Sequence, residues 1–142
     1  MKLSKNFNLS EFVVSTTASR KGINNTPNAA VIKNIQDSVD NLFQPVRDAL
    51  DKVMIINSGY RCPKLNEAVG GASTSAHKYG FAIDFICPSF GTPQQIVNFL
   101  SKFLKSNNIK FDQCIVEFNS WVHLSWKSSK GEQRCQVFAI NK

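Results

Sequence analysis

Residues 75–84 read SAHKYGFAID, a polar loop that runs into an apolar strand. We predict this strand over residues 81–86, where apolar side chains surround Asp84. A carboxylate in such a strand is costly to bury unless it is paired or bound to a metal ion. His77 lies on the loop that enters the strand, and Gly80 would let this loop turn tightly back over the strand end. The stretch therefore predicts that a histidine and an aspartate meet beside a buried strand.

The only other histidine is His123, which lies in the predicted strand 121–126. Alternate side chains of a strand share a face, so Asp84 and His123 would project into one cleft if their strands were neighbours. With His77 they would fill three positions around Zn²⁺ and leave a fourth open for water, as in catalytic zinc sites. An isolated histidine is more often a surface or hydrogen-bonded side chain. These residues alone therefore do not decide between a metal site and ordinary histidines.

The composition indicates a folded domain with a basic surface. Apolar residues make up 42% of the 142 residues and 11 residues are Phe, which favours a globule with its own core over disorder. The net charge of +7 favours polyanions such as nucleic acid, an anionic membrane or an anionic cell-wall polymer. The lysines and arginines are dispersed and form no basic tail, so we expect no nucleic-acid partner.

Targeting signals are not visible in the sequence. Residues 1–10 contain no apolar core of a signal peptide, and no apolar stretch approaches the roughly 18 residues of a membrane span. We therefore predict no signal peptide and no membrane insertion. The protein would be made in the cytoplasm and would act outside it only after release by another agent.

The cysteines are widely spaced and include no C-x-x-C pair, which disfavours a thiolate zinc cluster. Without an export signal, disulfides are also disfavoured. We expect free and mostly buried thiols at Cys62, Cys87, Cys114 and Cys135.

Helix signals dominate the first third of the chain. Residues 1–26 are polar and mixed, with a short helix that Ser10 could cap. Thr26 and Pro27 are typical of a helix start, and the apolar residues that follow recur every three or four positions for about 20 residues. Pro45 lies inside this amphipathic helix and should bend it or split it at the preceding residue.

The remainder mixes strands with helices. The predicted elements are a short buried strand over 53–56, a helix over 63–69, the strand 81–86, a helix opened by a capping box at 92–95, and strands over 111–118, 121–126 and 133–140. Short connections between the last three strands indicate antiparallel hairpins. We therefore predict a single α+β domain over residues 1–142 with an antiparallel sheet.

The motifs resemble those of a known family. The pattern Ser-x-His-x-x-Gly-x-Ala-x-Asp at 75–84, followed by Trp-x-His at 121–123, is similar to the zinc D,D-peptidase family. That family includes D-alanyl-D-alanine carboxypeptidases and phage endolysins. NSGYRCPKLN at 57–66, NEAVGGA at 66–72 and FNLSEF at 7–12 extend the resemblance over nearly the whole chain. It implies a Hedgehog/D,D-peptidase-like fold, with helices packed on one side of the sheet.

The resemblance also implies roles for individual residues. His77, Asp84 and His123 would be the zinc ligands. Arg61 would place a cation near the scissile carbonyl or a substrate carboxylate, a task that suits its fixed fork of donors; the alternative is a surface salt bridge. Ser75 would bind substrate by a hydrogen bond or hold the His77 loop.

For the general base, this chain departs from the pattern of the family it resembles. Many relatives carry an acidic residue three positions before the last histidine ligand, where this chain has Ser120. Glu117 lies six positions before His123, and a hairpin would bring it beside that histidine. We therefore predict Glu117 as the base, with Asp112 as the alternative. If neither acts as a base, each would be an exposed carboxylate at a strand edge with no catalytic role.

Three aromatic residues are candidates for lining the site. Trp121 shares a strand face with His123 and would wall the cleft, where it could orient that ligand or pack on peptide. Tyr60 precedes Arg61 and would line the same site, and Tyr79 is a weaker candidate.

The sequence thus predicts a zinc-dependent peptidase that hydrolyses amide bonds in peptidoglycan stem peptides or cross-links. It would be an endolysin or a D-alanyl-D-alanine carboxypeptidase, and it would act as a monomer on a host cell wall. The alternative is a non-catalytic zinc-containing module of the same fold that binds cell wall or protein.

Overall fold

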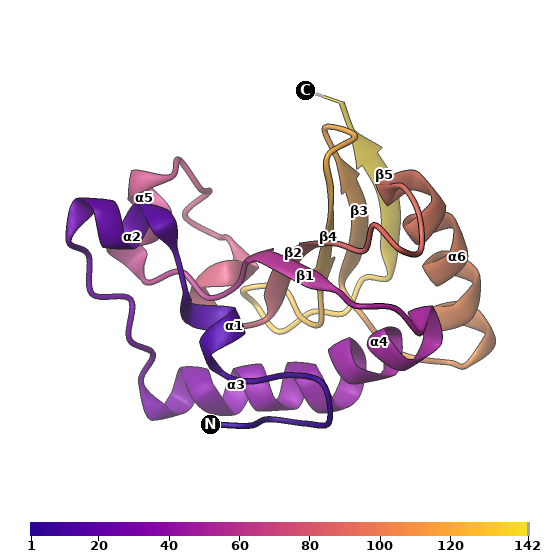
Figure 1. Ribbon diagram of the computed structural model, residues 1–142, viewed down its shortest axis with the longest axis horizontal. Coiled ribbons are helices and arrows are strands. Elements are labelled where there is room, and N and C mark those ends of the chain that lie inside the picture. The colour runs from indigo at the N-terminus through magenta and orange to yellow at the C-terminus, as the bar shows by residue number, and fades with distance from the viewer. Residues whose placement is uncertain (142) are drawn as a thin grey trace.

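The computed structural model describes residues 1–141 as an α+β domain built on one five-stranded sheet (Figure 1). The order of the strands across the sheet is β1-β2-β4-β3-β5. Their bounds are β1 Ile55–Ser58, β2 Ala82–Ile86, β3 Gln113–Glu117, β4 Trp121–Ser125 and β5 Gln136–Ile140. The predicted α+β class is confirmed.

The pairing of β5 differs from the prediction. β1 with β2, β2 with β4 and β3 with β4 are antiparallel, but β5 runs parallel to β3. The predicted hairpin between β4 and β5 is therefore wrong, and the sheet is mixed. Both edges of β4 are taken by β2 and β3, so the chain passes on to the free edge of β3.

The long amphipathic helix runs without a break through α3 (Ala29–Ser38), η1 (Val39–Phe43) and α4 (Gln44–Leu50). η1 is one π-helical turn just before Pro45, and this widening accommodates a residue that has no backbone N–H to donate. The helix is therefore not split near Gln44, and the predicted disturbance by Pro45 takes the form of this π-helical turn. The predicted start at Thr26 is wrong, because Asn28 is the N-cap and its side chain accepts a hydrogen bond from the Val31 amide.

The N-terminal segment contains two short helices, α1 (Ser10–Val13) and α2 (Thr16–Lys21), where one was predicted. Ser10 does not cap α1; the carboxylate of Glu11 accepts from the Asn8 amide instead. α2 was missed, and Ser15 caps it. The later helices α5 (Pro63–Ala68) and α6 (Pro93–Ser106) form as predicted, α6 with its capping box.

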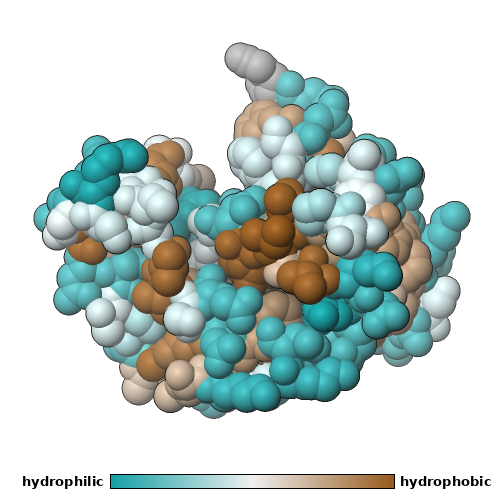
Figure 2. All heavy atoms as spheres, in the orientation of Figure 1, coloured by the Kyte–Doolittle hydropathy of each residue, from teal (hydrophilic) through white to brown (hydrophobic). Residues whose placement is uncertain are grey.

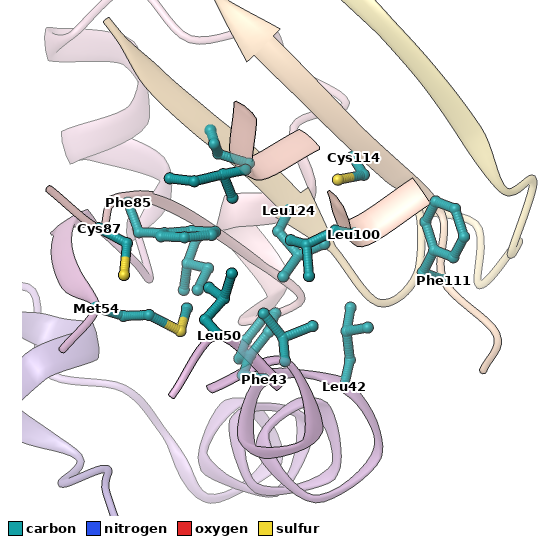
Figure 3. Packing of buried hydrophobic residues seen from close by; sticks show 14 of the residues in the cluster. Leu42, Phe43, Leu50, Met54, Phe85, Cys87, Leu100, Phe111, Cys114 and Leu124 are labelled. Carbon is teal, nitrogen blue, oxygen red and sulfur yellow. The ribbon is translucent and has the colours of Figure 1, made fainter. Parts of the chain in front are cut away.

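The hydrophobic core lies between one face of the sheet and the long helix with α6. Figure 3 shows Phe43 of the long helix, Leu100 of α6 and Leu124 of β4 gathered in this layer. The prediction that helices cover one side is thus confirmed. Residues 53–56 are not a buried strand, because β1 is the sheet's first strand and Ile55 is half exposed. The opposite face of β2 and β4 is free to carry polar side chains.

Among the described residues, none of the helices combines the length and apolar character that a bilayer crossing requires.

The thiols should report on this packing. All four cysteines are free; Cys87 and Cys114 are buried and Cys135 is exposed. Burial raises the pKa of Cys114 to about 12, so this thiol stays protonated and unreactive. We expect a thiol reagent at pH 8 to label Cys135 within minutes and Cys114 only in denaturant, as followed by mass spectrometry of peptides. Rapid labelling of Cys114 in the native protein would contradict the core described above.

Candidate active site

Three side chains converge on the polar face of the sheet. The potential ligand atoms of His77, Asp84 and His123 all lie within 4.8 Å of one another. Asp84 and His123 face each other directly across the β2–β4 pair. Oδ1 of Asp84 lies 3.0 Å from Nδ1 of His123 and 3.3 Å from Nε2 of His77. The three predicted ligands therefore form one cluster.

A single helical turn aims His77 into this cluster. η2 (Ala76–Tyr79) begins after Ser75, whose hydroxyl accepts a hydrogen bond from the His77 amide. Gly80 ends the turn at φ +81°, a left-handed conformation that glycine adopts without strain. A Cβ at this position would also lie 2.7 Å from the side chain of Ile35. The predicted turn at Gly80 is confirmed, and Ser75 holds the His77 loop.

The tautomer of His77 is set by the backbone. Its Nδ1 lies 2.7 Å from the carbonyl oxygen of Gly59, which can only accept, so Nδ1 carries the proton. Burial lowers the pKa of His77 and keeps the ring neutral, so a lone pair at Nε2 faces Asp84.

This arrangement fits a metal ion. A neutral Nε2 and a carboxylate oxygen are both acceptors, and two acceptors in contact repel each other unless a cation lies between them. Tetrahedral zinc, with bonds of about 2.0–2.1 Å, places its ligand atoms about 3.3 Å apart. The Asp84 oxygen lies 3.0 and 3.3 Å from the two histidine nitrogens, close to that spacing.

Arg61 directs its charge toward the cluster. Its Nη2 lies 3.7 Å from Oδ2 of Asp84, while Nε donates to Ser58 and Nη1 to Asn66. The side chain is only 15% exposed, so it is not a surface salt bridge. Burial lowers the pKa of Arg61, and the charges of Asp84 and Glu117 oppose that shift.

Glu117 lies on the same face, diagonal to His123. β3 pairs Ile115 with His123 and Glu117 with Trp121, so Glu117 and His123 are diagonal neighbours, about 7–8 Å apart. The indole Nε1 of Trp121 donates to Oε1 of Glu117 at 2.8 Å. Phe118 and Asn119 both have φ of +54°, which makes the connection a tight hairpin turn of the primed type. Glu117 lines the cleft at the end of β3, just before this turn.

The remaining candidates separate into two groups. Trp121 and Tyr60 line the cleft as predicted, although Tyr60 is largely buried. Tyr79 is not among the residues that line it and stacks on Phe81 instead. Asp112 is buried and bonded to Arg134 at 2.8 Å, which removes it as an alternative base.

The pair of Asp112 and Arg134 should therefore be structural. Asp112 accepts from the amide, Nε and Nη2 of Arg134 while its own carboxylate is buried. We expect Asp112→Asn to lower the free energy of unfolding by about 2 kcal/mol, measured by urea denaturation. Asp37→Asn, which breaks the exposed pair with Lys33, is the control and should change it by less than about 0.5 kcal/mol. Equal effects of the two substitutions would contradict this assignment.

Sequence reasoning gave no role to the residues that support the site. Gly59 orients His77 through its carbonyl group, and Asn66 holds Arg61. Asn25 ties down the same segment, since it donates to the Tyr60 carbonyl and accepts from the Cys62 amide. The motif at 57–66 contains most of these residues. A backbone carbonyl is present at every residue, however, so the sequence does not indicate which one accepts from His77.

The cluster lies in a cleft of about 1220 Å³. Figure 2 shows the surface hollowed between the lobe that carries α2 and α5 and the lobe that carries β3 and β5. On one side of the cluster the walls form a helical arm, here defined by Ser15, Thr16, Thr17, Val69 and Gly70. On the other side they form a sheet arm, here defined by Ile115, Glu117, Trp121, Phe138 and Ile140.

Two histidines and an aspartate that fit a metal, beside an arginine and a second carboxylate in an open cleft, define the class of metal-dependent hydrolases. A family model described as Peptidase M15 matches residues 5–125, which include all of these side chains. The chain belongs to the peptidase M15 family, whose peptidases are zinc-dependent. No curated protein sequence matches the chain.

Proposed function

We propose that the protein is a zinc-dependent peptidase that hydrolyses amide bonds in the stem peptides or cross-links of peptidoglycan. One observation carries this proposal: the cluster of His77, Asp84 and His123 shares a cleft face with the carboxylate of Glu117. Membership of the peptidase M15 family supports the peptide bond as the target. The peptidoglycan substrate rests on the resemblance of the motifs to D,D-peptidases.

In this proposal His77, Asp84 and His123 are the metal ligands. Zinc held by them would polarise the scissile carbonyl group and lower the pKa of a water molecule to about 7. Gly59 keeps the proton of His77 on Nδ1, so that Nε2 stays free to bind.

The proton transfers fall to Glu117. Its carboxylate takes a proton from the attacking water and delivers it to the leaving amine. The hydrogen bond from Trp121 fixes one carboxylate oxygen and leaves the other for this task. Arg61 stabilises the negative charge that develops on the carbonyl oxygen, because a guanidinium stays charged even where burial lowers its pKa.

The net charge of +7 supports an anionic polymer as the target. Long-range attraction raises the rate of encounter, and added salt weakens it. An endolysin that meets its substrate in the cell wall would benefit from this attraction, and we propose that role ahead of a cytoplasmic one. We expect a monomer in solution.

One observation favours a second candidate, a non-catalytic zinc module of the same fold. Ser120 stands where many D,D-peptidases carry their acidic residue. If Glu117 does not replace that residue, the cluster would bind zinc without supporting hydrolysis.

Digestion of purified peptidoglycan, followed by mass analysis of the soluble fragments, tests the proposal. We expect the zinc-loaded protein to release peptide fragments, and protein stripped by a chelator to release none until zinc is restored. A protein that holds one zinc ion per chain but releases no fragment would refute the peptidase and favour the non-catalytic module.

A further inference from the structure

The cleft extends on both sides of the metal cluster. A row of paired residues crosses the sheet through the cluster, in the order Ser58, Asp84, His123, Ile115 and Phe138. Neighbouring strands are about 4.8 Å apart, so the row continues about 10 Å past His123. An extended peptide rises about 3.3 Å per residue, so this sheet arm has room for about three residues.

The leaving half of a substrate belongs on the sheet arm. Glu117, the proposed proton donor to the leaving nitrogen, lies on that side of His123. The proton must be delivered within hydrogen-bond reach or through one water molecule. A carboxypeptidase releases a single residue, which would occupy only the first third of this arm.

Among the described residues that line the cleft, no unengaged cation lies on the sheet arm. The only cations among these residues are two arginines. Arg61 donates to Ser58 of β1 and Asn66 of α5, on the opposite side of the cluster from the sheet arm. Arg134 donates two bonds to Asp112. A free carboxylate on the sheet arm would therefore lack the bidentate partner that it needs when desolvated.

The sheet arm is instead apolar where it meets solvent. Phe138 on β5 is 43% exposed, and Phe118 packs edge-on against Trp121 at 5.5 Å between ring centroids. Such a surface suits the aliphatic parts of a continuing peptide chain and disfavours a chain end that carries a charge.

We propose that the site is an endopeptidase site, which binds peptide on both sides of the scissile bond and lays the leaving half along the sheet arm. This inference rests on the proposed function. It selects internal or cross-link bonds over the terminal bond of a stem peptide.

A pair of matched probes tests it. The first is a stem pentapeptide with a free C-terminal carboxylate, and the second is the same peptide with a C-terminal amide. We expect the zinc-loaded enzyme to cut both internally, at rates within about threefold, and to release fragments of two or more residues beyond the cut. Release of free alanine as the only product, with a loss of about 100-fold on amidation, would overturn the inference and leave the proposed peptidase standing. No product from either probe would overturn both.

A pair of variants tests the place of the leaving half. Phe138→Ala should lower kcat/KM about tenfold on a substrate with three residues beyond the cut. The same substitution should not change kcat/KM on a substrate with only one residue beyond the cut. Val137→Ala is the control, because Val137 is the next residue of β5, is 42% exposed and points to the opposite face. Equal losses in the two variants, or equal losses on the two substrates, would overturn the assignment of the sheet arm.

Discussion

Asp84→Asn should abolish both tight zinc binding and hydrolysis. Its carboxylate contacts both histidines. Loss of a residue that only hydrogen-bonds to a metal ligand lowers metal affinity ~10- to 100-fold, and loss of a ligand itself should lower it further. Zinc content after dialysis, measured by elemental mass spectrometry, is the first readout.

Thermal unfolding with and without zinc gives a second readout for Asp84. Zinc at 100 times its Kd should stabilise the wild-type protein by about 2.7 kcal/mol and leave Asp84→Asn unchanged. Asp112→Asn is the matched control, because it replaces another buried aspartate and should keep its zinc. One zinc ion per chain in Asp84→Asn would show that the metal lies elsewhere.

Glu117→Gln should separate binding from chemistry. The amide keeps the size of the side chain and can still accept from the Trp121 indole, but it cannot take a proton from water. We expect zinc content and KM to stay near their wild-type values and kcat to fall about 10²- to 10⁴-fold.

The control for this variant is Glu67→Gln, on the exposed surface of α5, which should keep full activity. Wild-type kcat in Glu117→Gln would remove Glu117 as the base. A loss of zinc in the same variant would make Glu117 a part of the metal site, and kcat could then not be assigned to proton transfer.

Side-chain periodicity predicted the geometry of the cluster well. Asp84 and His123 were placed on matching strand faces, and the β2–β4 register puts them directly opposite each other. Gly80 was predicted as a tight turn because only its conformational freedom allows the loop to fold back. These features depend on local pattern, which a sequence encodes directly.

The features that were missed are those for which the local sequence allows several alternatives of similar free energy. Asn28 and Thr26 are both good caps, and in the structure it is Asn28 that accepts from the helix. The residue types of β5 indicate a strand but not which strand it joins, so its parallel pairing with β3 could not be read from the sequence. The carbonyl of Gly59 has the same chemistry as any other, and only the fold brings it to His77.

The peptide of Gly59 joins the N-terminal segment to His77, a proposed metal ligand. A Cβ at Gly59 would lie 2.6 Å from the carbonyl oxygen of Phe12, and the next amide, that of Tyr60, donates to the same oxygen. On its other side, Gly59 accepts the proton of His77. One residue is therefore in contact with α1 and with a metal ligand at the same time.

Thermodynamic linkage makes this contact reciprocal. If docking of α1 strengthens metal binding by fixing His77, then metal binding stabilises the docking of α1 by the same free energy. Metal removal should then speed amide hydrogen exchange in residues 10–13, although none of them is a proposed metal ligand. Phe12, whose side chain is buried in the hydrophobic core, would then be a determinant of metal affinity.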